Sequence, residues 1–214
     1  MTHAALLALH VAVFGYWLGA DLVINSEYRF IVRRPDLAVA ARDAMTDHLM
    51  EVDQHVRYAL VLQATLGMVL LAGLGLAPAV LGWVAPIGGT AWLALVEAAH
   101  RNRKSAKGAR LALIDRALRY TVAALLVVAA VSMSGWPGWL RLKLVLFAGV
   151  IGCGVLIRFQ LIRHFGVWSE IVASGSSPGR EAQLRGIYRV ATAILLILWG
   201  QIVTIAVLAV FKPF

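Results

Sequence analysis

Residues 4–29 read AALLALHVAVFGYWLGADLVINSEYR, and this stretch decides the fold class. It is long and apolar enough to cross a bilayer as a helix, which takes about 20 mostly apolar residues. With about 3.6 residues per turn, its polar and aromatic side chains share one stripe, made of His10, Phe14, Trp17, Asp21 and Tyr28. An imidazole or a carboxylate in hydrocarbon is costly unless it finds partners. The sequence therefore predicts that this stripe faces the protein interior.

The whole chain has the composition of a helical membrane protein. It is 61% hydrophobic and 14% charged, whereas soluble domains carry about 25% charged residues. We expect an all-α, polytopic bundle in which residues 1–214 form a single integral membrane domain. Six transmembrane helices are predicted, at residues 4–24, 58–77, 79–96, 120–134, 140–162 and 188–210.

A polar segment follows the first predicted span. Between residues 37 and 52, apolar side chains recur at helical spacing opposite charged ones. This pattern predicts a separate amphipathic helix on the cytoplasmic membrane surface. Asp53 and Arg57 follow at i and i+4, a spacing that predicts an ion pair at the start of the second span.

The distribution of basic residues predicts the topology. The net charge is +9, and nearly all Arg and Lys residues fall in the loops after spans 1, 3 and 5. By the positive-inside rule these loops are cytoplasmic, so both termini lie outside. We expect a multi-pass protein of a bacterial inner membrane whose main partner is the lipid bilayer. Nucleic-acid binding is not expected, because the basic residues lie in short loops between spans.

The predicted topology brings a set of polar side chains to the outer half of the membrane. His10 lies roughly 9 Å below the outer surface, at about 1.5 Å per residue. Met133, Arg141 and Lys143 lie near the outer ends of spans 4 and 5. A buried histidine, nearby cations and the aromatic wall of Trp17 suit a haem b, with the histidine as axial ligand and the cations on the propionates.

Two alternatives to this haem site stay open. Arg141 and Lys143 have the length to extend to the outer headgroups without touching a cofactor. His10 and Met133 could together bind copper(I), because both are suitable ligands for a soft metal ion.

The other histidines belong to the opposite side of the membrane. His48, His55, His100 and His164 are predicted at the cytoplasmic side, too far from His10 to share an ion with it. Glu97 and His100 form a Glu-x-x-His pair, which is half of the di-iron bundle pattern. A solvated helix surface is the favoured interpretation, because the other carboxylates of that pattern are missing.

Asp21 is the one acidic residue inside an apolar span. It could relay protons, or it could pair with Arg29 or with a basic residue of another helix, and we favour the pairing. Cys153 is the sole cysteine, so an intrachain disulfide and a CxxCH haem attachment are excluded.

Three stretches resemble a known group of membrane proteins. LHVAVFGYWLGADL, residues 9–22, resembles the first span of the HemJ-type protoporphyrinogen oxidases and the related CopD-like membrane proteins. GWLRLKLVLFAGV, residues 138–150, resembles the lysine-bearing span of the same group. VDQHVRYALVLQATLGMVLLAGLG, residues 52–75, and the terminal FKPF are similar to an uncharacterised CopD-like branch.

The resemblance implies a helical bundle that binds haem b, in which His10 matches the group's first-span histidine and Lys143 its lysine. The HemJ type has a further histidine about eleven residues after that lysine, where this chain has Cys153 and Gly154, and it has four core spans. We therefore expect a haem protein in electron transfer or a porphyrin-linked redox step, and an oxidoreductase if it is an enzyme. A quinone or a redox protein would be the partner. The alternatives are a copper transport or resistance protein and a non-catalytic subunit or anchor of a larger membrane complex.

Overall fold

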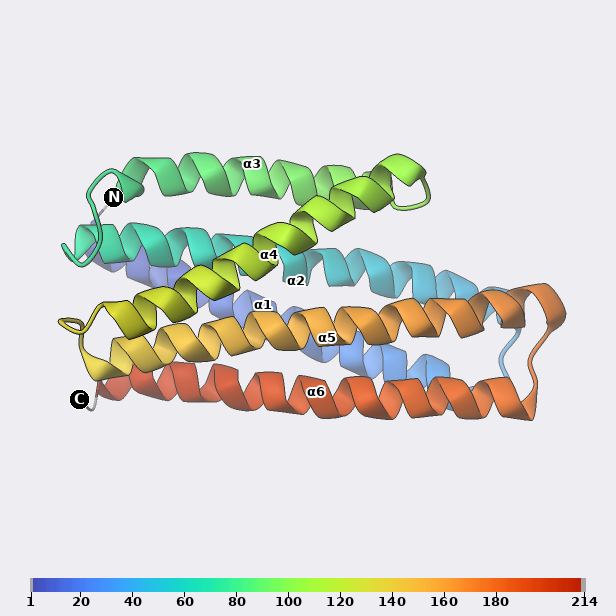
Figure 1. The fold of residues 1–214 in the computed structure, drawn as a ribbon. Coiled ribbons are helices and arrows are strands. Elements are labelled where there is room, and N and C mark those ends of the chain that lie inside the picture. Colours follow the sequence, from blue (N-terminus) through green and yellow to red (C-terminus); the bar gives the residue numbers. More distant parts are fainter. Residues whose placement is uncertain (1, 213–214) are drawn as a thin grey trace. The chain divides into compact units, whose positions relative to one another are not determined.

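The computed structural model describes residues 2–212, and these residues form six helices and no strand (Figure 1). The helices are α1 (His3–Arg33), α2 (Val39–Gly73), α3 (Leu81–Arg101), α4 (Ala106–Ser132), α5 (Gly138–Ser174) and α6 (Pro178–Phe211). The prediction of an all-α protein is confirmed. Most helices run beyond the predicted spans, because their charged ends continue the helix.

Five of the six helices are long and apolar enough to cross a membrane: α1, α2, α3, α5 and α6. α4 differs because its first half carries Lys107, Arg110, Asp115, Arg116 and Arg119, which leaves an apolar part of residues 120–132. The chain is therefore a multi-pass membrane protein by the length and composition of its helices.

Residues 39–73 form one helix, whereas the sequence predicted a surface helix followed by a separate span. No proline interrupts this segment, and its first glycine is Gly67, so nothing breaks the helix between its polar and apolar halves. The Asp53–Arg57 ion pair is confirmed at 2.6 Å, but it lies in the middle of α2 and not at a helix start.

The chain divides into two compact units. Unit 1 comprises residues up to 28 and residues 44–115, and unit 2 comprises residues 29–43 and 116–214. Within unit 1, α3 lies against α2 where Gly89 meets Thr65, at a distance so short that any larger side chain at Gly89 would collide with the threonine. Within unit 2, α5 and α6 lie side by side along most of their lengths.

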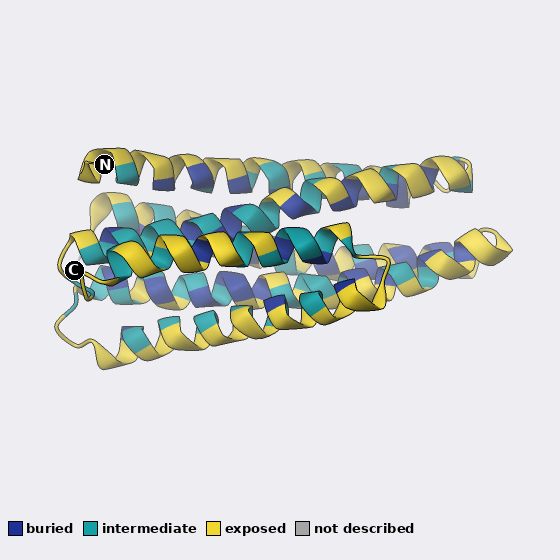
Figure 2. Cartoon of the chain, turned by 90° about the horizontal axis from the view of Figure 1, so that it is seen from above, coloured by how far each residue is buried: buried dark blue, intermediate teal, exposed yellow. Residues whose placement is uncertain are grey.

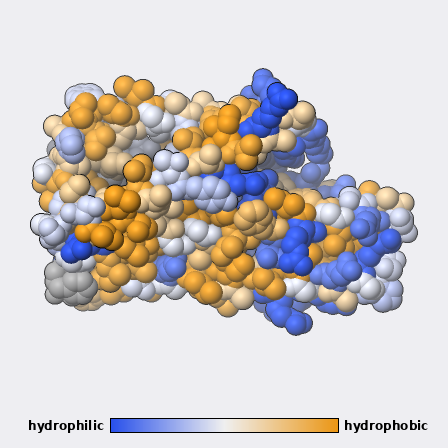
Figure 3. Space-filling view, in the orientation of Figure 1, coloured by the Kyte–Doolittle hydropathy of each residue, from blue (hydrophilic) through white to orange (hydrophobic). Residues whose placement is uncertain are grey.

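Burial follows the stripe predicted for α1. His10, Trp17, Asp21 and Tyr28 are all less than 9% exposed, and Phe14 is half-buried. The helices keep long exposed faces (Figure 2), and many of the exposed side chains are large and apolar (Figure 3). Apolar outer faces with polar inner stripes are what lipid contact requires.

Candidate functional site

His10 is the polar group around which the candidate site in unit 1 is built. Its side chain is buried on the inner stripe of α1, with 8% of its surface exposed. The Nε2 atom of His10 lies 3.1 Å from the side-chain amide nitrogen of Gln63 on α2. The side-chain amide of Gln63 thus helps to hold the imidazole in place.

Gly67 lies one helical turn after Gln63 and faces the same imidazole. A Cβ atom at this position would lie 3.6 Å from Cε1 of His10, which is ordinary van der Waals contact. The backbone of α2 therefore lies close to the edge of the ring at Gly67. Gln63 and Gly67, at i and i+4, form the wall of α2 that the histidine meets.

Sequence reasoning missed Gln63. A signal was present, because Gln63 is the single amide within the apolar run of residues 58–77. A buried amide at membrane depth needs a hydrogen-bond partner, and His10 is such a partner.

Trp17 and Asp21 continue the buried stripe, with 3% and 7% of their surfaces exposed. The prediction that His10 and Trp17 share the inner face of α1 is confirmed. Which group pairs with Asp21 stays a prediction, as does its role in proton transfer.

The remaining predicted site residues belong to unit 2. Nε of Arg141 donates a hydrogen bond of 2.6 Å to the backbone oxygen of Ala130, so this arginine caps the end of α4. Lys143 is half-buried on α5, and Met133 is 47% exposed in the link between α4 and α5. Their convergence with His10 on one cofactor stays a prediction.

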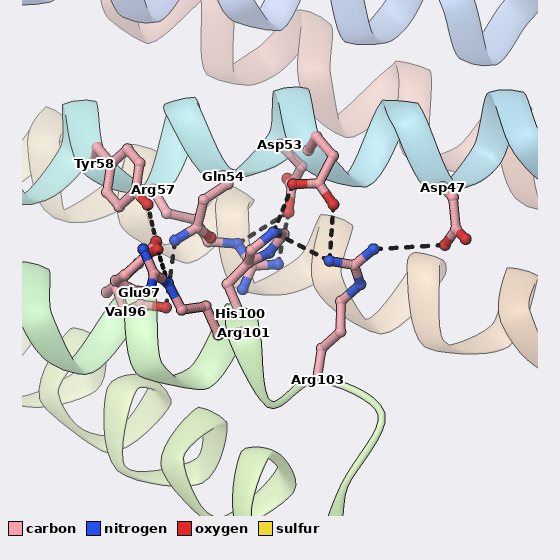
Figure 4. Close-up of polar contacts among 11 residues, drawn as sticks. Asp47, Asp53, Gln54, Arg57, Tyr58, Val96, Glu97, His100, Arg101 and Arg103 are labelled. Carbon is pink, nitrogen blue, oxygen red and sulfur yellow. Dashed lines mark hydrogen bonds and ion pairs between the residues drawn. The ribbon is translucent and has the colours of Figure 1, made fainter.

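A second polar group lies at one end of unit 1, where α2 meets α3 (Figure 4). Nε2 of His100 lies 2.8 Å from Glu51, and a guanidinium nitrogen of Arg103 lies 2.8 Å from the same carboxylate. Nearby, the Tyr58 hydroxyl donates a hydrogen bond to Glu97. The Glu97 carboxylate also pairs with Arg101, one turn later on α3.

This group is an ion-pair network and not a metal centre. Its carboxylates face arginines, which supply the charge that a metal would otherwise supply. Among residues 2–212, no three His, Cys, Asp or Glu side chains gather closely enough to hold a metal ion. Elsewhere on α2, the His55 ring nitrogen contacts the Tyr16 hydroxyl of α1. His55 therefore joins two helices of unit 1.

The most deeply buried charge is in unit 2, and sequence reasoning missed it as well. The Arg42 side chain is fully buried and donates two hydrogen bonds to Glu181, of 2.7 and 3.0 Å. Its guanidinium lies 5.0 Å from the centre of the Trp168 ring, and Nε1 of Trp168 donates a 2.7 Å hydrogen bond to Asp43. These contacts join the first turn of α2 to α5 and α6.

The buried ion pair could not have been read from the sequence. Arg42 and Glu181 are 139 residues apart, and each stands in a segment that resembles a solvated helix end. Sequence spacing detects ion pairs within one helix, such as Asp53 and Arg57, but not pairs between helices.

Comparison with family models, with curated proteins and with solved structures gave no match for this chain. The resemblance to the HemJ and CopD-like group accordingly stays a prediction.

The chemistry of His10 is compatible with a histidine ligand to haem, because the imidazole is buried and its Nε2 contacts a neutral amide. A single histidine suits haem iron better than a hard cation, which needs several oxygen ligands.

Proposed function

We propose that this protein is a membrane-embedded b-type haem protein that transfers electrons, with His10 as an axial ligand. The observation that carries the proposal is the buried His10 imidazole, held between Gln63 and Gly67 at membrane depth. Buried histidines inside membrane spans are rare and usually functional. A bound haem would supply a one-electron redox couple within the bilayer.

The chain's own residues would bind and orient the cofactor. Gln63 accepts or donates a hydrogen bond according to how its amide is turned. Its contact with Nε2 orients the imidazole, and His10 would be the residue that holds a bound haem. The apolar surroundings, including the buried Val13 and Trp17 on the same helix, exclude water from the ring.

The proposal predicts that His10 is the histidine required for haem binding. We expect purified wild-type protein, expressed with haem supplied, to carry haem in a fixed ratio to protein. His10→Ala should lose most of it, because the substitution removes the proposed iron ligand. His48→Ala is the matched control, because His48 is exposed on α2. Equal haem content in both variants would overturn the assignment of His10.

Copper binding is the alternative to haem binding, and the same purified proteins test it. Elemental analysis that finds copper and no iron in wild-type protein, and no copper in His10→Ala, would replace the haem proposal with a copper site. Met133 would then be the next residue to substitute.

We further propose that α4 makes a sixth crossing through residues 120–132, with both termini outside a bacterial inner membrane. The argument is the charge pattern, because the links after α2 and α4 carry no Arg or Lys, whereas the segments between predicted spans 1 and 2, 3 and 4, and 5 and 6 are basic. An electron-transfer role then calls for a quinone or a redox protein as partner at a membrane surface.

A further inference from the structure

Unit 2 contains a groove of about 610 Å³ between α5 and α6. Both helices line it with residues at i, i+3, i+4 and i+7, starting at Arg163 on α5 and at Gln183 on α6. Its volume lies within the range of roughly 300–1,000 Å³ found for ligand sites.

Two glycines keep the groove open. Gly166 and Gly186 lie within the lining, one on each helix, and a Cβ atom added at either position would meet no atom within 4 Å. A space this large beside both backbones would accept a larger side chain, so packing between the helices does not explain the two glycines. They instead leave room for an occupant.

The groove lies where α5 and α6 pass from their apolar to their charged parts. Arg163 lies six residues after the end of the uninterrupted apolar run of α5 at Ile157, and Val190 lines the groove where the apolar run of α6 begins. Glu170 and Gln183 lie toward the short link that joins the two helices. One end of the groove therefore borders hydrocarbon and the other borders water.

The charges of the groove favour an anion. Glu170 is already paired with Arg180, at 3.4 Å, and Glu181 is taken by Arg42. Arg163 donates to the Gln160 side-chain oxygen, at 3.3 Å, a neutral acceptor that does not cancel the positive charge of the guanidinium. The lining thus presents an arginine at the membrane boundary and an amide, Gln183, further out.

We propose that this groove binds an anionic phospholipid with a hydroxyl-bearing headgroup. Arg163 contacts the phosphodiester, Gln183 hydrogen-bonds the headgroup hydroxyls, and Ile187 and Val190 contact the first carbons of the acyl chains. Basic pockets between membrane helices at the bilayer surface are suited to such headgroups. This site is independent of His10 and of the proposed haem.

Native mass spectrometry of the purified full-length protein tests the proposal, with phosphatidylglycerol and phosphatidylcholine offered together. We expect wild-type protein to retain phosphatidylglycerol preferentially. Arg163→Gln should weaken that retention about fivefold, which corresponds to one basic residue at a membrane surface. Arg185→Gln, which removes an exposed α6 charge outside the lining, should retain the lipid as wild type does.

The shape of the groove is tested separately. Gly186→Leu should fill the groove and reduce phosphatidylglycerol retention, whereas Gly200→Leu, at an open position of α6 outside the groove, should not. Equal losses in Arg163→Gln and Arg185→Gln would overturn the proposal, because they indicate general surface charge. Equal retention of phosphatidylcholine, or displacement of the lipid by millimolar inorganic phosphate, would also overturn it.

Discussion

At the scale of single residues, burial separates two kinds of polar side chain in this chain. His10 sits beside a neutral amide and a glycine, which is an arrangement that can admit a ligand. Arg42 and Glu181 are joined by two hydrogen bonds, and Ser176 donates a further 2.6 Å hydrogen bond to Glu181. We infer that the first is a binding position and the second holds unit 2 together.

Removing one partner of the buried ion pair should be strongly destabilising. Glu181→Gln removes the carboxylate that accepts two hydrogen bonds from the fully buried Arg42, and we expect a loss of about 3–5 kcal/mol of stability. The measurement is the apparent melting temperature of the purified protein in detergent.

The matched control is a solvent-exposed ion pair of the same protein. In the link between α1 and α2, hydrogen bonds from the exposed Arg34 lower the pKa of Asp36. Asp36→Asn should leave the melting temperature unchanged. A Glu181→Gln protein as stable as Asp36→Asn would contradict the structural role of the buried pair. Replacing Arg42 and Glu181 together by Met and Leu should recover part of the loss.

Gly67 offers a residue-scale test of the packing around His10. Gly67→Ala should be tolerated, because the added Cβ makes ordinary contact with the imidazole. Gly67→Leu should push against the ring and cost about 1–3 kcal/mol, read again as a lower melting temperature. Gly19→Leu, at an open position of α1, is the control that should stay close to wild type. Equal effects at the two glycines would mean that the α2 backbone does not contact His10.

At the scale of elements, the polar stripe of α1 could be predicted and the extent of α2 could not. The helical repeat assigns the faces of α1, because the side chains that share a stripe depend on the geometry of that one helix. The polar half of α2 carries the same signal whether it lies on a membrane surface or continues into the span. In the structure Arg42 is buried in unit 2 and paired with Glu181, so the first turn of α2 packs within unit 2.

The continuity of α2 can be tested by a proline. Val52→Pro removes a backbone donor in the middle of the observed helix, and we expect it to cost about 3 kcal/mol or more. Val52→Ala, which is compatible with a helix, should cost much less. Thermal melting followed by circular dichroism measures both. Similar stabilities would indicate that a helix ends near residue 52, as the sequence had predicted.

At the scale of the whole molecule, composition predicted an all-helical membrane protein, because apolar runs and helix length are properties of continuous sequence. The contacts His10–Gln63 and Arg42–Glu181 join residues from separate helices, so they depend on packing that no single run reveals. The same limit applies to the cofactor, since a second ligand need not be near His10 in the sequence.

The number of crossings is the whole-molecule prediction. With six crossings, an alkaline phosphatase fused after residue 212 is active, and one fused within residues 174–178 is inactive. If α4 does not cross, α5 and α6 cross the membrane in the opposite directions. The fusion after residue 212 is then inactive, and the fusion within residues 174–178 is active. A fusion within residues 102–105 should be inactive in either case and serves as the control.

The central claim is tested most directly by one absorption spectrum of the purified wild-type protein, recorded as isolated and after addition of dithionite, with haem supplied during expression. The account predicts a Soret band and sharp α and β bands in the reduced state, typical of a b-type haem. A spectrum without visible bands in both states would contradict it, and His10 would then be a buried histidine that only joins α1 to α2.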